Sequence, residues 1–178
     1  MGWLANFFFN RSGQSGQTEK LYRMLMIQSR NPALFGDKKI PDTYDGRLES
    51  LTNHMAVVFA ALREADAEKS GKIRQDLFDI MVSDFNVALR EEGLTDEGLK
   101  HRMRPMIGYF YARLKKVTEN LQDNDELKAV LIERALKNCS PHFAQIKTDY
   151  IQFLFEQLSN TSLDDIVNCN FDFPKISN

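Results

Sequence analysis

The side chains that could carry catalysis or bind a metal are few and widely separated in this sequence. They are three histidines and two cysteines, namely His54, His101, His142, Cys139 and Cys169. No nucleophile lies near a base at a catalytic spacing, and the isolated glycines form no phosphate-binding loop. A lone histidine such as His54 is more typical of a hydrogen-bonded structural residue than of a ligand. The sequence therefore predicts no catalytic site, no metal site and no cofactor.

A more informative pattern is the helical hairpin predicted between residues 84 and 116. Gly93 lies where a helix C-cap needs a residue free to adopt positive φ, and Asp96 is expected to cap the next helix with its carboxylate. The second helix has an apolar spine at spacings of three and four residues: Leu99, Met103, Met106, Phe110 and Leu114. Its other faces are basic, because the stretch from Gly98 to Lys116 has no acid and contains Lys100, Arg102, Arg104, Arg113, Lys115 and Lys116. This composition favours a recognition surface.

Both faces of this predicted helix allow more than one interpretation. The basic residues can form a solvated face, a docking surface for acidic protein segments or anionic lipid headgroups, or an RNA contact such as one on the ribosome. The methionines and aromatic residues can belong to the core, or they can line an adaptable groove that repacks around varied clients. The candidate client- or partner-binding residues are Arg102, Arg104, Met103, Met106, Tyr109, Tyr111 and Arg113.

Length and charge indicate one ordinary globular domain. The chain has 178 residues and a formal net charge of −2, which argues against DNA or other non-specific nucleic-acid binding by the whole molecule. It has no apolar run long enough to cross a membrane. Residues 1–17 lack the features of a signal peptide or a mitochondrial leader, so a cytoplasmic location is expected.

The same N-terminal segment, 1–17, has two predicted parts. The run MGWLANFFF places Trp3 and Phe7 close to one helical face, which suits either an interfacial membrane anchor or an end that docks on the protein's own core or is disordered. Residues 12–17, SGQSGQ, have the composition of a flexible linker.

Hydrophobic periodicity predicts helices and no strands in the rest of the chain. The expected helices cover 18–30, 43–68, 73–92, 96–116, 123–138 and 140–158, with a long loop at 31–44 and a break at Ser70-Gly71. Pro105 should bend or restart the helix that contains it. The predicted fold is an all-α single-domain bundle of about six helices, with a domain at 18–160 and a tail at 161–178 whose FDFPKI end lies back on the surface.

Two runs of residues resemble one known family, the ubiquinol–cytochrome c chaperones. The first run includes Tyr44, Arg47, Glu49, Leu51 and His54. The second includes Leu89, Arg90, Glu91, Gly93, Asp96, a basic stretch around Met103, and then Phe110, Tyr111 and Arg113. The sequence departs from the family pattern in having Lys100 where a proline is usual, Pro105 within the helix, and Ala112 in place of a glycine.

The resemblance implies a non-enzymatic assembly chaperone. Its client would be newly synthesised cytochrome b, and its action would promote assembly of ubiquinol–cytochrome c reductase. The expected location is peripheral, at the cytoplasmic face of a bacterial inner membrane, with possible contact to the ribosome. Two alternatives remain open, a ribosome- or RNA-associated helical module and an adaptor that pairs with a partner helix.

Overall fold

The fold is organised around one almost completely buried helix. The computed structural model describes residues 13–63, 67–134 and 136–176. Within them, α2 (Tyr44–Arg63) has a continuous buried stretch from Leu48 to Phe59 that includes polar as well as apolar side chains. A helix buried on most of its surface must be covered by several neighbours. The predicted all-α fold is confirmed, with seven α-helices in the described part of the chain.

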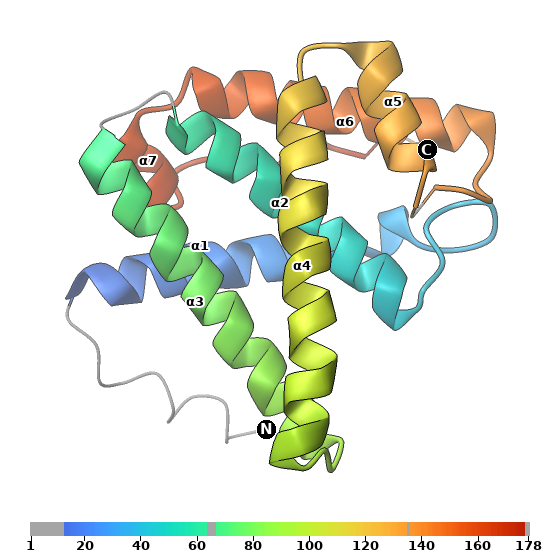
Figure 1. Ribbon diagram of the computed structural model, residues 1–178. Coiled ribbons are helices and arrows are strands. Elements are labelled where there is room, and N and C mark those ends of the chain that lie inside the picture. Colours follow the sequence, from blue (N-terminus) through green and yellow to red (C-terminus); the bar gives the residue numbers. More distant parts are fainter. Residues whose placement is uncertain (1–12, 64–66, 135, 177–178) are drawn as a thin grey trace.

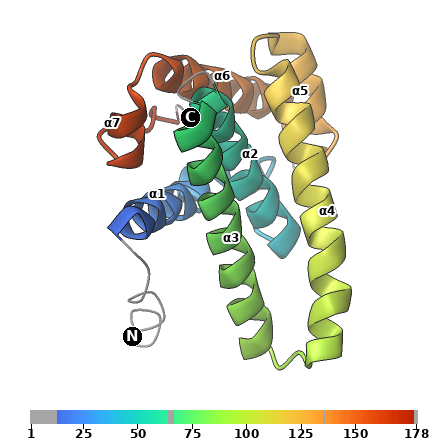
Figure 2. The ribbon, with the colours of Figure 1, turned by 60° about the vertical axis from the view of Figure 1, so that its left-hand side comes forward.

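The other helices surround α2 on several sides. α1 (Gly13–Ser29), α3 (Ala67–Glu91), α4 (Asp96–Asn120) and α6 (Pro141–Ser159) all pack against it, and α5 (Asn124–Ile132) bridges α4 and α6. Figure 1 shows α4 crossing α2, while α5 and α6 lie at one end of the molecule. The turned view shows α3 and α4 as an antiparallel hairpin whose connecting turn points away from α6 (Figure 2).

Several predicted helix boundaries are wrong. Gly13–Gln17, expected in a flexible linker, belong to α1, and residues 1–12 with the predicted apolar anchor lie outside the described residues. Ser70 and Gly71, expected to break the chain, lie inside α3, where the Ser70 side chain is fully buried. Burial of Ser70 in tertiary contacts overrides the low helix propensity of this pair. The helix predicted at 123–138 ends as an α-helix at Ile132.

The loop before α2 and the tail after α6 complete the core. A 3-10 helix (Pro32–Leu34) in the loop buries Leu34, and Ile40 is also fully buried. After the short α7 (Leu163–Val167), the tail buries Phe171 and packs Phe173 and Ile176 against the main core. The extended FDFPKI segment therefore contributes apolar packing as well as covering the surface.

Candidate functional site

The turn between α3 and α4 is formed by residues of the second run that resembles the chaperone family, from Leu89 to Asp96. Gly93 has φ +87°, and α3 ends in a Schellman arrangement in which Gly93 N–H bonds the Arg90 carbonyl and Leu94 N–H bonds the Leu89 carbonyl. The predicted N-cap is wrong by one residue, because the Thr95 hydroxyl accepts from Gly98 N–H. Asp96 instead forms an exposed ion pair with Arg90 at 2.8 Å, and Glu91 is also exposed.

A small second hydrophobic cluster holds the hairpin together near its turn. It consists of Leu48, Leu89, Leu99, Met103 and Met106. Met103 and Met106, on either side of Pro105, are both buried, which keeps the two halves of α4 against the same neighbours. The restart expected at Pro105 is not found, since α4 continues as one helix from Asp96 to Asn120. Ala112 is exposed, so its extra methyl group meets no close backbone.

The structure divides the candidate binding residues by burial. Arg102, Arg104 and Tyr111 are exposed, Tyr109 is half-buried, and Met103, Met106 and Phe110 are buried. Arg113 is only 3% exposed, which contradicts its predicted place on a binding face. The reason is an internal ion pair, since its guanidinium faces Glu49 of α2.

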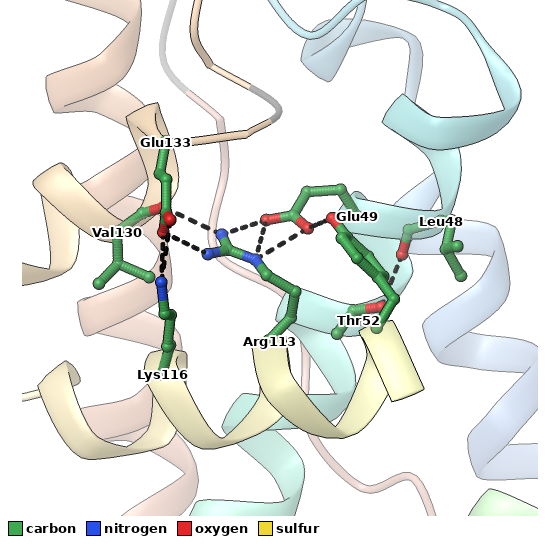
Figure 3. A network of polar contacts seen from close by, with 8 residues as sticks. Leu48, Glu49, Thr52, Arg113, Lys116, Val130 and Glu133 are labelled. Carbon is green, nitrogen blue, oxygen red and sulfur yellow. Dashed lines mark hydrogen bonds and ion pairs between the residues drawn. The ribbon is translucent and has the colours of Figure 1, made fainter. Parts of the chain in front are cut away.

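Glu49 and Arg113 form the centre of a buried polar network (Figure 3). Arg113 Nε donates to both carboxylate oxygens of Glu49, at 3.0 and 3.1 Å, and its Nη2 bonds Glu49 and the Val130 carbonyl. The Tyr109 hydroxyl donates to Glu49, and Glu133 bonds Lys116 at 2.8 and 2.9 Å. Burial and the Glu49 charge raise the pKa of Tyr109, so its hydroxyl remains a donor. The network joins α2, α4 and the end of α5.

This network also divides the basic face of α4 into two parts. In the C-terminal part, Lys115 pairs with Glu119 and Lys116 with Glu133. In the N-terminal part, Arg102 and Arg104 have no ion-pair partner among the described residues. Any recognition through the basic residues of α4 therefore falls to its N-terminal part.

A groove of about 810 Å³ opens beside that N-terminal part. Its walls come from the loop before α2 and the first turns of α2, from one face of α4, and from the segment that follows α5. Arg102, Met106 and Tyr109 line it along α4, and Glu133, Arg134 and Lys137 line it from the segment at and after the end of α5. Tyr44 stands between, with its hydroxyl 2.8 Å from the Met106 sulfur and its ring 6.0 Å from the Arg102 guanidinium carbon.

Gly46 fixes the wall of this groove formed by the loop before α2. A Cβ atom at Gly46 would come within 2.1 Å of the Pro41 carbonyl oxygen. The next residue, Arg47, braces the same loop by a two-bond pair with Asp42, at 2.6 and 3.1 Å.

His54 is a buried, hydrogen-bonded side chain of α2. It is fully buried, with Nδ1 2.7 Å from the Ser50 carbonyl oxygen and Nε2 2.9 Å from the Tyr150 hydroxyl. Burial lowers the pKa of His54 to about 3, with a further contribution from the Lys147 charge. Leu51 is buried in the main core on the same helix.

The sequence did not reveal the polar contacts of three residues, Glu49, Glu133 and Lys147, although Glu49 belongs to the first run that resembles the family. Glu49 and Lys147 lie within predominantly apolar helix faces. A charged residue at such a position indicates a buried polar contact, and this was the feature of the sequence that could have revealed them. Glu133 carried no such signal, because it lies in an exposed segment and its role depends on the approach of α4. Among the described residues, no three His, Cys, Asp or Glu side chains gather as metal ligands, and no helix is long and apolar enough to cross a membrane.

The architecture has a counterpart among solved structures. The fold matches a crystal structure of the Cbp3 homolog from Brucella abortus with a TM-score of 0.78 at 21% sequence identity, over 92% of this chain and 91% of that chain. At this identity the likeness shows a shared all-α fold. A search of curated proteins found no match.

The sequence itself gives the family. The ubiquinol–cytochrome c chaperone family matches residues 37–173, which include both runs of residues that carry the resemblance. This chain belongs to that family. The groove, the hairpin and the buried network all lie inside the matched region.

Proposed function

We propose that this protein is a non-enzymatic chaperone that binds newly synthesised cytochrome b and promotes assembly of ubiquinol–cytochrome c reductase. The observation that carries the proposal is the family match over residues 37–173. The family is one of chaperones for this complex, so a protein client is implied. Cytochrome b is the client that the resemblance of the two residue runs indicates.

The proposed client surface is the exposed N-terminal part of α4 together with its neighbouring groove. Arg102 and Arg104 supply unpaired positive charge, and Tyr111 is 48% exposed on the same helix. Met103, Met106 and Tyr109 support this surface from beneath, and Met106 and Tyr109 also line the groove. Peripheral contact with the inner membrane from the cytoplasmic side would bring this surface to a client that is still being inserted.

Co-purification of a newly made client tests this function. Cytochrome b is translated with a radioactive label in the presence of membranes and the tagged full-length protein, followed by brief crosslinking and purification under denaturing conditions. We expect cytochrome b to be captured in preference to a membrane protein of similar length and hydropathy. Equal capture of both proteins would contradict a dedicated client.

A charge-reversed variant locates the client surface in the same experiment. Arg102→Glu/Arg104→Glu should reduce capture of cytochrome b several-fold while its circular dichroism spectrum stays that of the wild type. Both side chains are exposed, so their replacement disturbs no core packing. Undiminished capture by the folded variant would remove these two residues from the proposed surface.

The ribosome alternative receives its support from the same two arginines. Phosphate contacts weaken steeply as salt rises, whereas apolar contacts with a client persist. Sedimentation of the protein with ribosomes at low and high salt measures this alternative separately from client capture.

A further inference from the structure

The groove beside α4 has an excess of positive charge. Arg102, Arg134 and Lys137 line it, and none of these three forms an ion pair with another described residue. Arg134 and Lys137 are exposed, as is Arg102. The cations come from two different segments of the chain, α4 and the residues after α5, so the positive charge is a property of the groove and not of one helix face.

Two of the three acidic side chains that line the groove are already bonded by tyrosine or basic side chains. Glu49 is bonded by Arg113 and Tyr109, and Glu133 by Lys116 and Arg113. The bond from Lys116 and the neighbouring positive charges lower the pKa of Glu133. Since Arg113 and Lys116 do not line the groove, they offset these two glutamates from outside it. Asp45 is then the single uncommitted acid beside three cations.

Two of the cations lie near aromatic rings. The Arg102 guanidinium carbon lies 6.0 Å from the centre of the Tyr44 ring, and that of Arg134 lies 5.7 Å from the centre of the Tyr109 ring. A guanidinium over a ring keeps the N–H donors at its edge available for a carboxylate. Both arginines can therefore offer two-bond contacts to a carboxylate ligand.

The two arginines reach the groove at different places along α4. Arg102 and Tyr109 lie seven residues apart on α4, which corresponds to roughly 10 Å of rise along the helix axis, and the Arg134 guanidinium lies over the Tyr109 ring. A ligand that contacts both arginines must therefore extend along the groove. Met106 and Leu48 form an apolar floor between the two ends.

We infer that this groove binds an extended acidic segment of a protein partner, with two of its carboxylates engaging Arg102 and Arg134 and an apolar side chain resting on Met106. The inference deepens the proposed function, because it names the chemistry of the client segment that this surface takes. The groove chemistry itself does not depend on which protein supplies the segment.

Fluorescence anisotropy with the purified full-length protein tests the inference. The probe is a labelled ten-residue peptide with glutamates at two positions three residues apart and leucine between them, and its control has lysines in place of the glutamates. We expect saturable binding of the acidic peptide and none of the basic one. Arg102→Gln/Arg134→Gln should weaken binding at least about tenfold, since each charge-assisted contact contributes substantially to affinity.

A matched variant removes the same charge from outside the groove. Lys100→Gln/Lys115→Gln changes two exposed cations on α4 that do not line the groove, so it should leave the dissociation constant within about twofold. Equal weakening by both double variants would show attraction to general positive charge and would overturn the inference. Absence of binding by the wild-type protein would overturn it too.

Two competitors identify the class of ligand. Vesicles rich in anionic phospholipid and a ten-nucleotide RNA are added to the complex of protein and peptide. If either competitor displaces the peptide, and the competitor itself no longer binds the Arg102→Gln/Arg134→Gln variant, the groove is a phosphate site and the peptide proposal is wrong. If neither competes, the peptide assignment is supported.

Cytochrome b capture separates this inference from the proposed function. If the wild-type protein binds the acidic peptide in the groove but captures no cytochrome b, the proposed function fails and the groove assignment stands. If it captures cytochrome b and Arg102→Gln/Arg134→Gln does so equally well, the groove is not where this client binds and the deeper assignment is overturned.

Discussion

At the scale of single residues, Arg113 connects more of the structure than any exposed cation of α4. Its guanidinium reaches Glu49 on α2, the Val130 carbonyl on α5 and the Glu133 carboxylate just beyond α5. Both Arg113 and Glu49 are almost fully buried. A buried ion pair costs desolvation when it forms, but removal of one partner leaves an uncompensated charge in the interior.

Arg113→Met should therefore lower the free energy of unfolding by roughly 3 to 5 kcal/mol. The double variant Glu49→Leu/Arg113→Met should recover much of this loss, because neither charge is then left alone. Urea denaturation of both variants and of Glu49→Leu measures the coupling between the two residues. A loss below about 0.5 kcal/mol in Arg113→Met would contradict the structural role assigned to it, since this is the range of ordinary surface substitutions.

Lys147 is a second buried cation, and it lacks the partners that Arg113 has. Its Nζ lies 4.8 Å from the centre of the Tyr150 ring and has no hydrogen-bond partner among the described residues. Burial lowers the pKa of Lys147 to about 7, and attraction to Glu49 opposes this. In the unfolded chain the lysine pKa is near 10.5, so the unfolded state binds more protons than the folded state between these two values.

The free energy of unfolding should consequently rise between pH 7 and pH 9, by up to about 1.4 kcal/mol per pH unit from this group. Lys147→Met should remove this rise and should be at least as stable as the wild type at pH 7. Denaturant titrations at several pH values measure both effects. Parallel pH profiles for the two proteins would show that Lys147 does not titrate in this range.

His54 acts in a lower pH window. Its pKa is lowered from 6.5 to about 3, so below pH 6.5 the unfolded state takes up a proton that the folded state does not. We expect stability to fall as the pH drops from 6.5 towards 3, and His54→Gln to reduce the dependence on pH in that window. Thermal unfolding followed between pH 4 and 7 checks this, and an unchanged slope in the variant would assign the acid sensitivity to other groups.

At the scale of elements, the position of the loop before α2 depends on one glycine. Gly46→Ala places a methyl group against the Pro41 carbonyl and should displace the loop that forms a wall of the groove. Gly108 is the matched control, since a Cβ there meets nothing within 4 Å in the middle of α4. Gly108→Ala should stabilise the protein by about 0.5 to 1 kcal/mol, because alanine favours the helix.

Gly46→Ala should instead lower the melting temperature by several degrees and weaken binding of the acidic peptide. Differential scanning calorimetry and the anisotropy titration measure the two effects on the same samples. A Gly46→Ala protein as stable as Gly108→Ala would show that the loop accommodates the extra methyl group without strain.

The helices and their apolar faces followed from sequence periodicity, whereas contacts between helices did not. Leu99, Met103, Met106 and Phe110 are buried as their spacing predicted. The pairing of Arg113 with Glu49 was missed because the two residues are distant in sequence and meet only when α4 crosses α2. The same reason explains the groove, whose walls come from three separate segments.

Local rules failed at several helix limits. The sequence predicted Asp96 as the N-cap of α4, whereas the preceding residue, Thr95, caps the helix by accepting from Gly98 N–H. At Pro105 and at Ser70-Gly71, unfavourable local preferences were outweighed by burial of neighbouring side chains in the core. Residue burial therefore decided the helix limits more strongly than propensity did.

At the scale of the whole molecule, the parts combine into a helical support with an open basic groove. The main core cluster gathers buried apolar residues from all seven described α-helices, and the hairpin of α3 and α4 carries a separate small cluster near its turn. The groove lies between these parts, beside that cluster. Such an arrangement suits a protein that holds a client segment without acting on it chemically.

Deletion of the gene tests the proposed role in assembly, with cytochrome b content measured by reduced-minus-oxidised difference spectra of the membranes. We expect a strong loss of the cytochrome b signal and of ubiquinol–cytochrome c reductase activity, restored by the wild-type gene and less well by one encoding Arg102→Glu/Arg104→Glu. Normal cytochrome b content and normal reductase activity in the deletion strain would contradict the assignment as an assembly chaperone for this complex.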